Sequence, residues 1–150
     1  MQYDRSSGLL LHITSLPGPY GIGTMGREAF RFVDFLSESG QKIWQLLPLG
    51  HTGYGDSPYQ CFSAFAGNPL LIDLDKLIEA GLLNSADLPQ DNFDPDFVDF
   101  GAVFNYKYPL LKKAYDRFSQ SATKLQRMQF ETFCLSNRDW LNDYAFFMAL

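Results

Sequence analysis

The first 50 residues of the chain carry a pattern of apolar and polar positions that is typical of a strand–helix–strand unit. The runs at 8–16 and 42–49 are largely apolar, which predicts two buried strands of a parallel sheet. Between them, apolar residues recur at helical spacing over 26–39, which predicts an amphipathic helix, and Gly40 is placed to cap its C-terminus. Strands joined in this way form a right-handed βαβ unit, so the sequence predicts neighbouring parallel strands.

The remainder of the chain is predicted to be mostly helical. The apolar run at 70–74 predicts a short third strand, and 75–80 predicts a short helix that Gly81 stops. Aspartates and prolines alternate with phenylalanines over 84–101, which predicts an ordered loop because its apolar side chains need a surface to bury against. Pro109 is expected to kink the next helix or to start its regular part. The remaining helices are predicted over 103–118, 123–134 and 138–150.

Composition and charge narrow the possible functions. The chain has 150 residues, a net charge of −5 and an isoelectric point near 4.8, so it lacks the basic surface that a nucleic acid requires. No apolar run reaches the length of a membrane span, and the N-terminus does not have the pattern of a signal peptide. Cys61 and Cys134 have no metal-binding spacing and are expected to be reduced. We therefore expect a cytoplasmic protein with neither a nucleic acid nor a membrane as its partner.

A glycine motif lies between the first predicted strand and the helix. Residues 21–26 spell G-x-G-x-x-G, the fingerprint of dinucleotide-binding folds. Two observations disfavour a nicotinamide cofactor. Residues 15–20 separate the strand from the first glycine, so the tight turn is missing, and the second strand ends at 48–51 without the expected ribose-binding acid. The alternative is a glycine-rich loop that leads into a helix N-terminus.

The loop at 51–68, directly after the second predicted strand, is the best candidate for ligand binding. Such loops carry the binding chemistry of α/β proteins. Tyr54 lies between two glycines, so its ring is expected to project, and Tyr59 follows a proline that restricts the loop. Flat aromatic faces suit sugar rings, and Asp56 and Ser57 can bond sugar hydroxyls. Alternatively, Tyr59 anchors the loop in a core, Tyr54 is a surface residue without a role, and Asp56 and Ser57 cap the loop backbone.

The histidines and the remaining acids are not assigned to catalysis. His12 follows three leucines and is expected to be buried and hydrogen-bonded, and His51 has no partner that the sequence identifies. Asp73 falls in the third predicted strand, and the acids of 84–99 lie in a loop without a paired base. No residue of the chain is therefore a candidate catalyst or metal ligand.

Four segments of the first half resemble the N-terminal part of bacterial 4-alpha-glucanotransferases, the amylomaltase or disproportionating enzyme family. They occur in the same order as in that family, which is a more specific signal than any single short motif. A further similar segment, WLNDYAFFMAL, lies at 140–150. The four segments are GLLLHITSLPGPYGIG at 8–23, WQLLPLG at 44–50, TGYGDSPYQ at 52–60 and SAFAGNP at 63–69.

The resemblance implies a fold and an activity. It implies that 1–74 contributes the opening strands of a (β/α)₈ TIM barrel and that 75–150 is a mostly helical insertion, within an α/β fold. The family transfers α-1,4-glucan segments to glucose or glucan acceptors by a retaining double displacement, without cofactor or metal. Its catalytic Asp, Glu and Asp lie on later barrel strands, so no catalytic residue is expected in this chain. The rival interpretation is a stand-alone, non-catalytic glucan-binding module.

The resemblance also implies roles for residues of the loop. The tyrosine that matches Tyr59 forms the floor of the subsite where the bond is cleaved. Tyr54 matches an exposed aromatic residue that supports a remote glucan groove, and Phe104 is expected beside it by analogy. Asp56 and Ser57 would bond sugar hydroxyls of an α-1,4-glucan or malto-oligosaccharide substrate.

Overall fold

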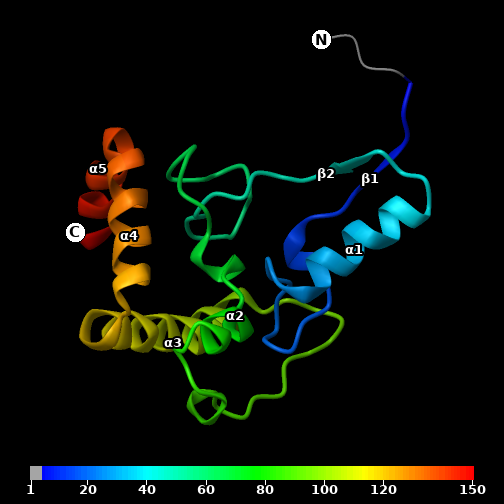
Figure 1. Ribbon diagram of the computed structural model, residues 1–150. Coiled ribbons are helices and arrows are strands. Elements are labelled where there is room, and N and C mark those ends of the chain that lie inside the picture. The colour runs from blue at the N-terminus through cyan, green and yellow to red at the C-terminus, as the bar shows by residue number, and fades with distance from the viewer. Residues whose placement is uncertain (1–4) are drawn as a thin grey trace.

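The N-terminal third of the chain forms the predicted parallel strand–helix–strand unit. The protein is represented by a computed structural model that describes residues 5–150. Strand β1 (Gly8–Leu10) pairs in parallel with β2 (Ile43–Gln45), and helix α1 (Arg27–Glu38) joins them (Figure 1). Gly40, at φ 71°, directly follows Ser39, the C-cap residue of α1, as predicted. The parallel arrangement is therefore confirmed.

Both strands are shorter and less buried than the sequence predicts. After β1 the chain turns into a 3-10 helix, η1 (Ile13–Ser15), instead of continuing as a strand to residue 16. Trp44 of β2 packs edge-on against Phe32 of α1, with ring centroids 4.9 Å apart. Helix α1 does not cover the strands completely, because Leu10 is 57% exposed and Ile43 is 49% exposed.

The predicted third strand at 70–74 is wrong. The chain forms a 3-10 helix, η2 (Pro69–Leu71), followed by helix α2 (Leu74–Glu79). The side chain of Asn68 accepts a bond from Leu70 N at 2.9 Å, and that of Asp73 accepts one from Lys76 N at 3.1 Å. These side chains offer the backbone local partners, which favours helix N-termini over a strand ladder.

The helical half agrees closely with the prediction. After the short 3-10 helix η3 (Ser85–Asp87), the chain forms α3 (Phe100–Ser121), α4 (Lys124–Ser136) and α5 (Arg138–Ala149). Helix α3 runs through Pro109, so this proline does not start the regular part of the helix. Helices α4 and α5 pack side by side, and both stand steeply on α3 (Figure 1). Asp99 caps α3, and Thr123 caps α4.

Helix α3 supplies the inner side of the core. Val103 and Lys107 are fully buried, and Leu110 and Ala114 continue the same face of the helix. This face packs against η2, against α2 and against the loop that follows α2. Phe93 and Val98 of that loop and Phe100, the first residue of α3, are partly buried, as predicted, whereas Phe97 is 68% exposed, contrary to the prediction.

Candidate functional site

The two ends of the loop after β2 lie side by side and are joined by backbone hydrogen bonds. Isolated antiparallel bridges join Gly50 to Gly67 and Thr52 to Cys61. The backbone N–H of residue 62 donates to His51 O at 2.9 Å, and that of residue 68 donates to Leu49 O at 2.8 Å. The loop therefore projects from the C-terminal ends of the parallel strands, where α/β proteins place their binding sites.

A tight turn presents Tyr54 at the tip of this loop. Asp56 N donates to Gly53 O at 3.2 Å, and the turn places Gly55 at φ 94° and Asp56 at φ 52°. Aspartate tolerates this left-handed conformation better than most residues, and glycine adopts it freely. The Tyr54 side chain is fully exposed at 106%, so its ring projects as its flanking glycines predict.

Tyr59 lies on the return of the loop and is not a core residue. Its side chain is 74% exposed, which contradicts the alternative that it anchors the loop in a core. Gln60 N donates to Ser57 O at 3.0 Å, and Cys61 Sγ donates to Pro58 O at 3.0 Å. These bonds fix the backbone around Tyr59 and use the carbonyl of Ser57, not its hydroxyl.

Two adjoining hollows flank the tip of the loop. The larger, about 680 Å³, lies between the tip and the N-terminal half of α3, and Tyr54 and Phe104 both line it. The smaller, about 250 Å³, lies where β1 and β2 end, against η1 and the first residues after β2. Asp56 lines both hollows, whereas Ser57 and Tyr59 line neither. Asp56 therefore belongs to the wall that the two hollows share.

An aromatic cluster, of which the sequence predicts only Phe104, forms one wall of the larger hollow. The rings of Phe104 and Tyr108 stack on α3 with centroids 3.9 Å apart. His51 lies between two tyrosine hydroxyls, with Nε2 3.3 Å from Tyr108 and Nδ1 3.0 Å from Tyr144 on α5. Phe62 packs edge-on against the His51 ring at 5.6 Å. No local pattern in the sequence connects His51 with residues 57 and 93 positions away.

Burial shifts the pKa values of these polar groups. Burial lowers the pKa of His51, which favours the neutral imidazole. Burial also raises the pKa values of Tyr108 and Tyr144, and the proximity of Tyr144 adds to the rise at Tyr108. The cluster is therefore a set of neutral hydrogen-bonding groups rather than a charged centre.

The glycine motif is explained by close packing inside the chain. A Cβ at Gly23 would lie 1.9 Å from the carbonyl oxygen of Ile13, and one at Gly26 would lie 1.8 Å from Asp73 Oδ2. Thr24 also donates to Asp73 Oδ2, at 2.5 Å. Asp73 therefore places a carboxylate at the N-terminus of α1, where a dinucleotide fold holds its pyrophosphate. Two anionic groups would repel each other there, which argues against the nicotinamide alternative.

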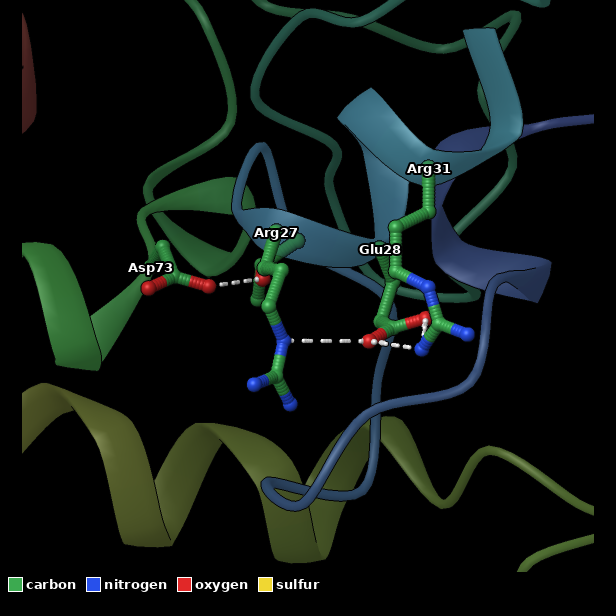
Figure 2. A network of polar contacts seen from close by, with 5 residues as sticks. Arg27, Glu28, Arg31 and Asp73 are labelled. Atoms are coloured by element: carbon green, nitrogen blue, oxygen red, sulfur yellow. Dashed lines mark hydrogen bonds and ion pairs between the residues drawn. The ribbon is translucent and has the colours of Figure 1, made fainter. Parts of the chain in front are cut away.

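Charged residues of α1 complete the surface around Asp73. Glu28 pairs with Arg27 at 3.3 Å and with Arg31 at 3.1 Å, and Figure 2 shows this group separately from the bond that Asp73 accepts. Both arginines are well exposed, so these pairs contribute little to stability.

The sequence predictions also covered His12 and the acids of the loop at 84–99. His12 is only partly buried, and its buried Nδ1 has no hydrogen-bond partner within residues 5–150, so the predicted hydrogen-bonded histidine is wrong for this atom. Burial lowers the pKa of His12.

Among the loop acids, Asp99 caps α3, and Asp87 pairs with Lys113 at 2.7 Å and Arg117 at 3.1 Å.

Comparison with known proteins agrees with this α/β architecture. A family model described as 4-alpha-glucanotransferase matches residues 11–150. The chain therefore belongs to the 4-alpha-glucanotransferase family, as its sequence segments predict. No helix within residues 5–150 is both long and apolar enough to cross a membrane.

Individual relatives match nearly the whole chain. It is 53% identical over 150 residues to the 4-alpha-glucanotransferase of Thermus thermophilus, covering all of this chain and 29% of that protein. It is 51% identical to the enzyme of the same name from Clostridium butyricum, covering 93% of this chain and 28% of that protein. It also resembles the structure of amylomaltase from Streptococcus agalactiae in complex with acarbose, with a TM-score of 0.86 and 46% identity. The match covers 97% of this chain and 29% of that chain. The chain thus spans less than a third of the length of these relatives.

Proposed function

We propose that this chain acts as the N-terminal part of a 4-alpha-glucanotransferase that transfers α-1,4-glucan segments to glucose or glucan acceptors. The observation that carries the proposal is the family match over 11–150, combined with an aromatic loop and two hollows at the C-terminal ends of parallel strands. Nothing in the comparisons favours a stand-alone glucan-binding module, because the relatives that match are transferases.

In this proposal the two parts of the chain have different tasks. Residues 1–74 supply the opening strands of a (β/α)₈ barrel, and the parallel β1–α1–β2 unit supports this assignment. Residues 75–150 form the helical insertion, and α3 provides one wall of the larger hollow. The protein acts in the cytoplasm.

The loop residues are proposed to contact successive parts of the substrate. Tyr59, exposed beside a backbone fixed by local hydrogen bonds, stacks on the sugar at the scissile bond. Ser57 and Asp56 bond sugar hydroxyls, and Asp56 has the geometry for this because it lines both hollows. Tyr54 and Phe104, which line the larger hollow, hold a more distant part of a long glucan.

The chemistry itself is assigned to residues that match none in this chain. Retaining transfer needs one carboxylate as nucleophile and one carboxylic acid to protonate the leaving oxygen, about 5–5.5 Å apart. By family resemblance, these groups belong to later barrel strands. The chain described here binds and orients the glucan, and neither a metal nor an organic cofactor takes part.

A chimera tests the proposal. This chain would replace the matching N-terminal segment of the Thermus thermophilus enzyme, which is 53% identical to it. The purified chimera would be incubated with maltotriose, and glucose and longer glucans would be followed by chromatography. We expect disproportionation. A chimera that folds, by circular dichroism and thermal unfolding, but neither binds nor transfers malto-oligosaccharides would contradict the proposal.

A further inference from the structure

We propose that His51 is a positioning residue for the larger hollow and that it acts through Tyr108 to hold the ring of Phe104. The inference rests on the proposed function, because it assumes that the larger hollow binds the distant part of a long glucan. It adds to that function the residue that fixes the position of the Phe104 ring in the wall of the hollow. The three side chains come from two segments that are far apart in the sequence.

The His51 ring is held on both sides. Its Nε2 lies 3.3 Å from the Tyr108 hydroxyl on α3, and its Nδ1 lies 3.0 Å from the Tyr144 hydroxyl on α5. Phe62 packs edge-on against the ring, and Phe147 of α5 packs against Phe62 at 5.9 Å. The imidazole therefore has a fixed orientation at the junction of the loop, α3 and α5.

The protonation state of His51 suits this arrangement. Burial disfavours the charged ring, and a neutral imidazole has one donor nitrogen and one acceptor nitrogen. Each tyrosine hydroxyl can supply the complementary group. A neutral His51 thus satisfies both tyrosines at once, and either tautomer does so.

The contact with Tyr108 reaches the hollow through Phe104. These two residues are one helical turn apart on α3, and their rings stack with centroids at 3.9 Å and an interplanar angle of 28°. Phe104 is 46% exposed and lines the hollow opposite the loop tip that carries Tyr54. Without the bond to His51, the Tyr108 ring loses its tether, and the stacked Phe104 ring loses a fixed neighbour.

The contact with Tyr144 has a different consequence. It links the loop to α5 and does not touch α3 or Phe104. Loss of this bond is expected to loosen the attachment of α5 without changing the hollow. The two hydroxyls therefore provide a matched pair: Tyr108→Phe removes the bond that leads to Phe104, and Tyr144→Phe removes the bond that does not.

Two substitutions of His51 itself distinguish its contact with Tyr108 from its contact with Tyr144. A glutamine amide reaches about as far as Nε2 and can retain the bond to Tyr108, whereas an asparagine amide reaches about as far as Nδ1 and can retain the bond to Tyr144. His51→Gln should therefore rescue the positioning of Phe104, and His51→Asn should not. A residue whose role is only to stabilise the fold would not give this pattern.

The first measurement uses the chimera and does not depend on its activity. Aromatic NMR signals of Phe104 and Tyr108 report the mobility of their rings. We expect the Phe104 signals to shift and sharpen in Tyr108→Phe and His51→Asn, and to remain near those of the unchanged chimera in Tyr144→Phe and His51→Gln. Identical Phe104 signals in all five proteins would overturn the inference.

The second measurement uses the chimera and compares a long glucan with maltotriose. We expect Tyr108→Phe and His51→Asn to raise KM for the long glucan about two- to ten-fold, the range for loss of one hydrogen bond, and to raise KM for maltotriose less. Equal effects on both substrates, or none, would overturn the inference while leaving the proposed function intact. An unchanged chimera without transfer activity would instead overturn the proposed function and this role of His51 with it. The NMR data would still show whether His51 fixes the ring.

Discussion

Gly26 lies directly against the carboxylate of Asp73, so the N-cap residue of α1 packs closely against the N-cap residue of α2. A Cβ at residue 26 would lie 1.8 Å from Asp73 Oδ2, while the same carboxylate accepts bonds from Thr24 Oγ1 and Lys76 N. We expect Gly26→Ala to destabilise the chain by about 1–3 kcal/mol, because the carboxylate must move and lose its partners. Urea unfolding of the chain measures this change.

Two further variants show whether the clash with Asp73 is the cause. Gly67→Ala adds a methyl group into open space and should leave the unfolding midpoint nearly unchanged. Asp73→Ala removes the carboxylate, so Gly26→Ala should cost much less in that background than alone. Additive effects of the two substitutions would mean that the close approach of Gly26 to Asp73 is not what constrains this position.

Because of Lys107, the free energy of unfolding of the chain should increase as pH rises from about 8 to 10. Its ammonium group is fully buried and donates to Leu70 O at 2.6 Å and Ile72 O at 2.7 Å. Burial lowers the pKa of Lys107 from 10.5 to about 8, against an opposing effect of Asp73. Between pH 8 and 10 the unfolded chain binds this proton and the folded chain does not, so stability increases as pH rises.

The pH dependence of urea unfolding tests the assignment to Lys107. The comparison is limited to pH 7.5–10, since the raised pKa values of Tyr108 and Tyr144 favour the unfolded state above that range. Lys107→Met should abolish the rise and lower stability by removing the donor to the carbonyls of Leu70, which is buried, and Ile72. Lys112→Met, at an exposed position of the same helix, is the control. If the stability of Lys107→Met still increases with pH over this range, the group that titrates is not Lys107.

Asp87 should make the chain sensitive to acid. A bond from Lys113, one from the backbone N–H of Asn84 and one from Arg117 lower the pKa of Asp87 from 3.8 to about 2. A depressed pKa contributes stability above pH 4 that is lost as pH falls towards 2, because the unfolded chain takes up the proton first. Asp87→Asn should flatten this part of the stability curve, measured by thermal unfolding from pH 2 to 6. Asp139→Asn, a fully exposed carboxylate, should leave the curve unchanged.

Local patterns were sufficient to predict most of the backbone. The apolar period over 26–39 and the glycine after it identify α1, and Thr123 with Gln126 forms the capping box that starts α4. The short run at 70–74 was misread because an apolar run of that length fits a strand or a tight helical turn equally well. Asn68 and Asp73 decide between the two through side-chain bonds to the backbone.

The course and exposure of the loop at 51–68 were predicted more completely than its surroundings. Flanking glycines indicate the exposure of Tyr54, and the family segments indicate Tyr59. The positions of Phe104 and Tyr108 relative to His51 depend on how α3 and α5 fold back against the loop, which no local period encodes. The role of each loop residue towards a sugar remains a prediction that substitutions must test.

Tyr59 and Tyr54 are expected to affect glucan transfer in different ways. Both rings are exposed, but only Tyr54 lines the larger hollow. Tyr59→Ala in the chimera should reduce transfer from maltotriose about ten-fold or more, if a sugar stack contributes about as much as a base–aromatic stack of roughly 1–3 kcal/mol. Tyr54→Ala should weaken the use of long glucans more than that of maltotriose. Wild-type turnover of maltotriose by Tyr59→Ala would show that Tyr59 does not hold the reacting sugar.

The 150-residue chain alone is expected to associate and to lack transferase activity. Apolar side chains are exposed on the strand pair and on α1, including Leu10 at 57%, Phe30 at 62% and Ile43 at 49%, and both strands have an unpaired edge within the described residues. The carboxyl pair of the retaining reaction is assigned to later strands of the family. Sedimentation velocity should show concentration-dependent association that Leu10→Lys and Ile43→Lys reduce, and chromatography should show no products from maltotriose. A monodisperse chain would contradict the first expectation, and clear disproportionation would mean that one of its own acids, such as Asp56, takes part in catalysis.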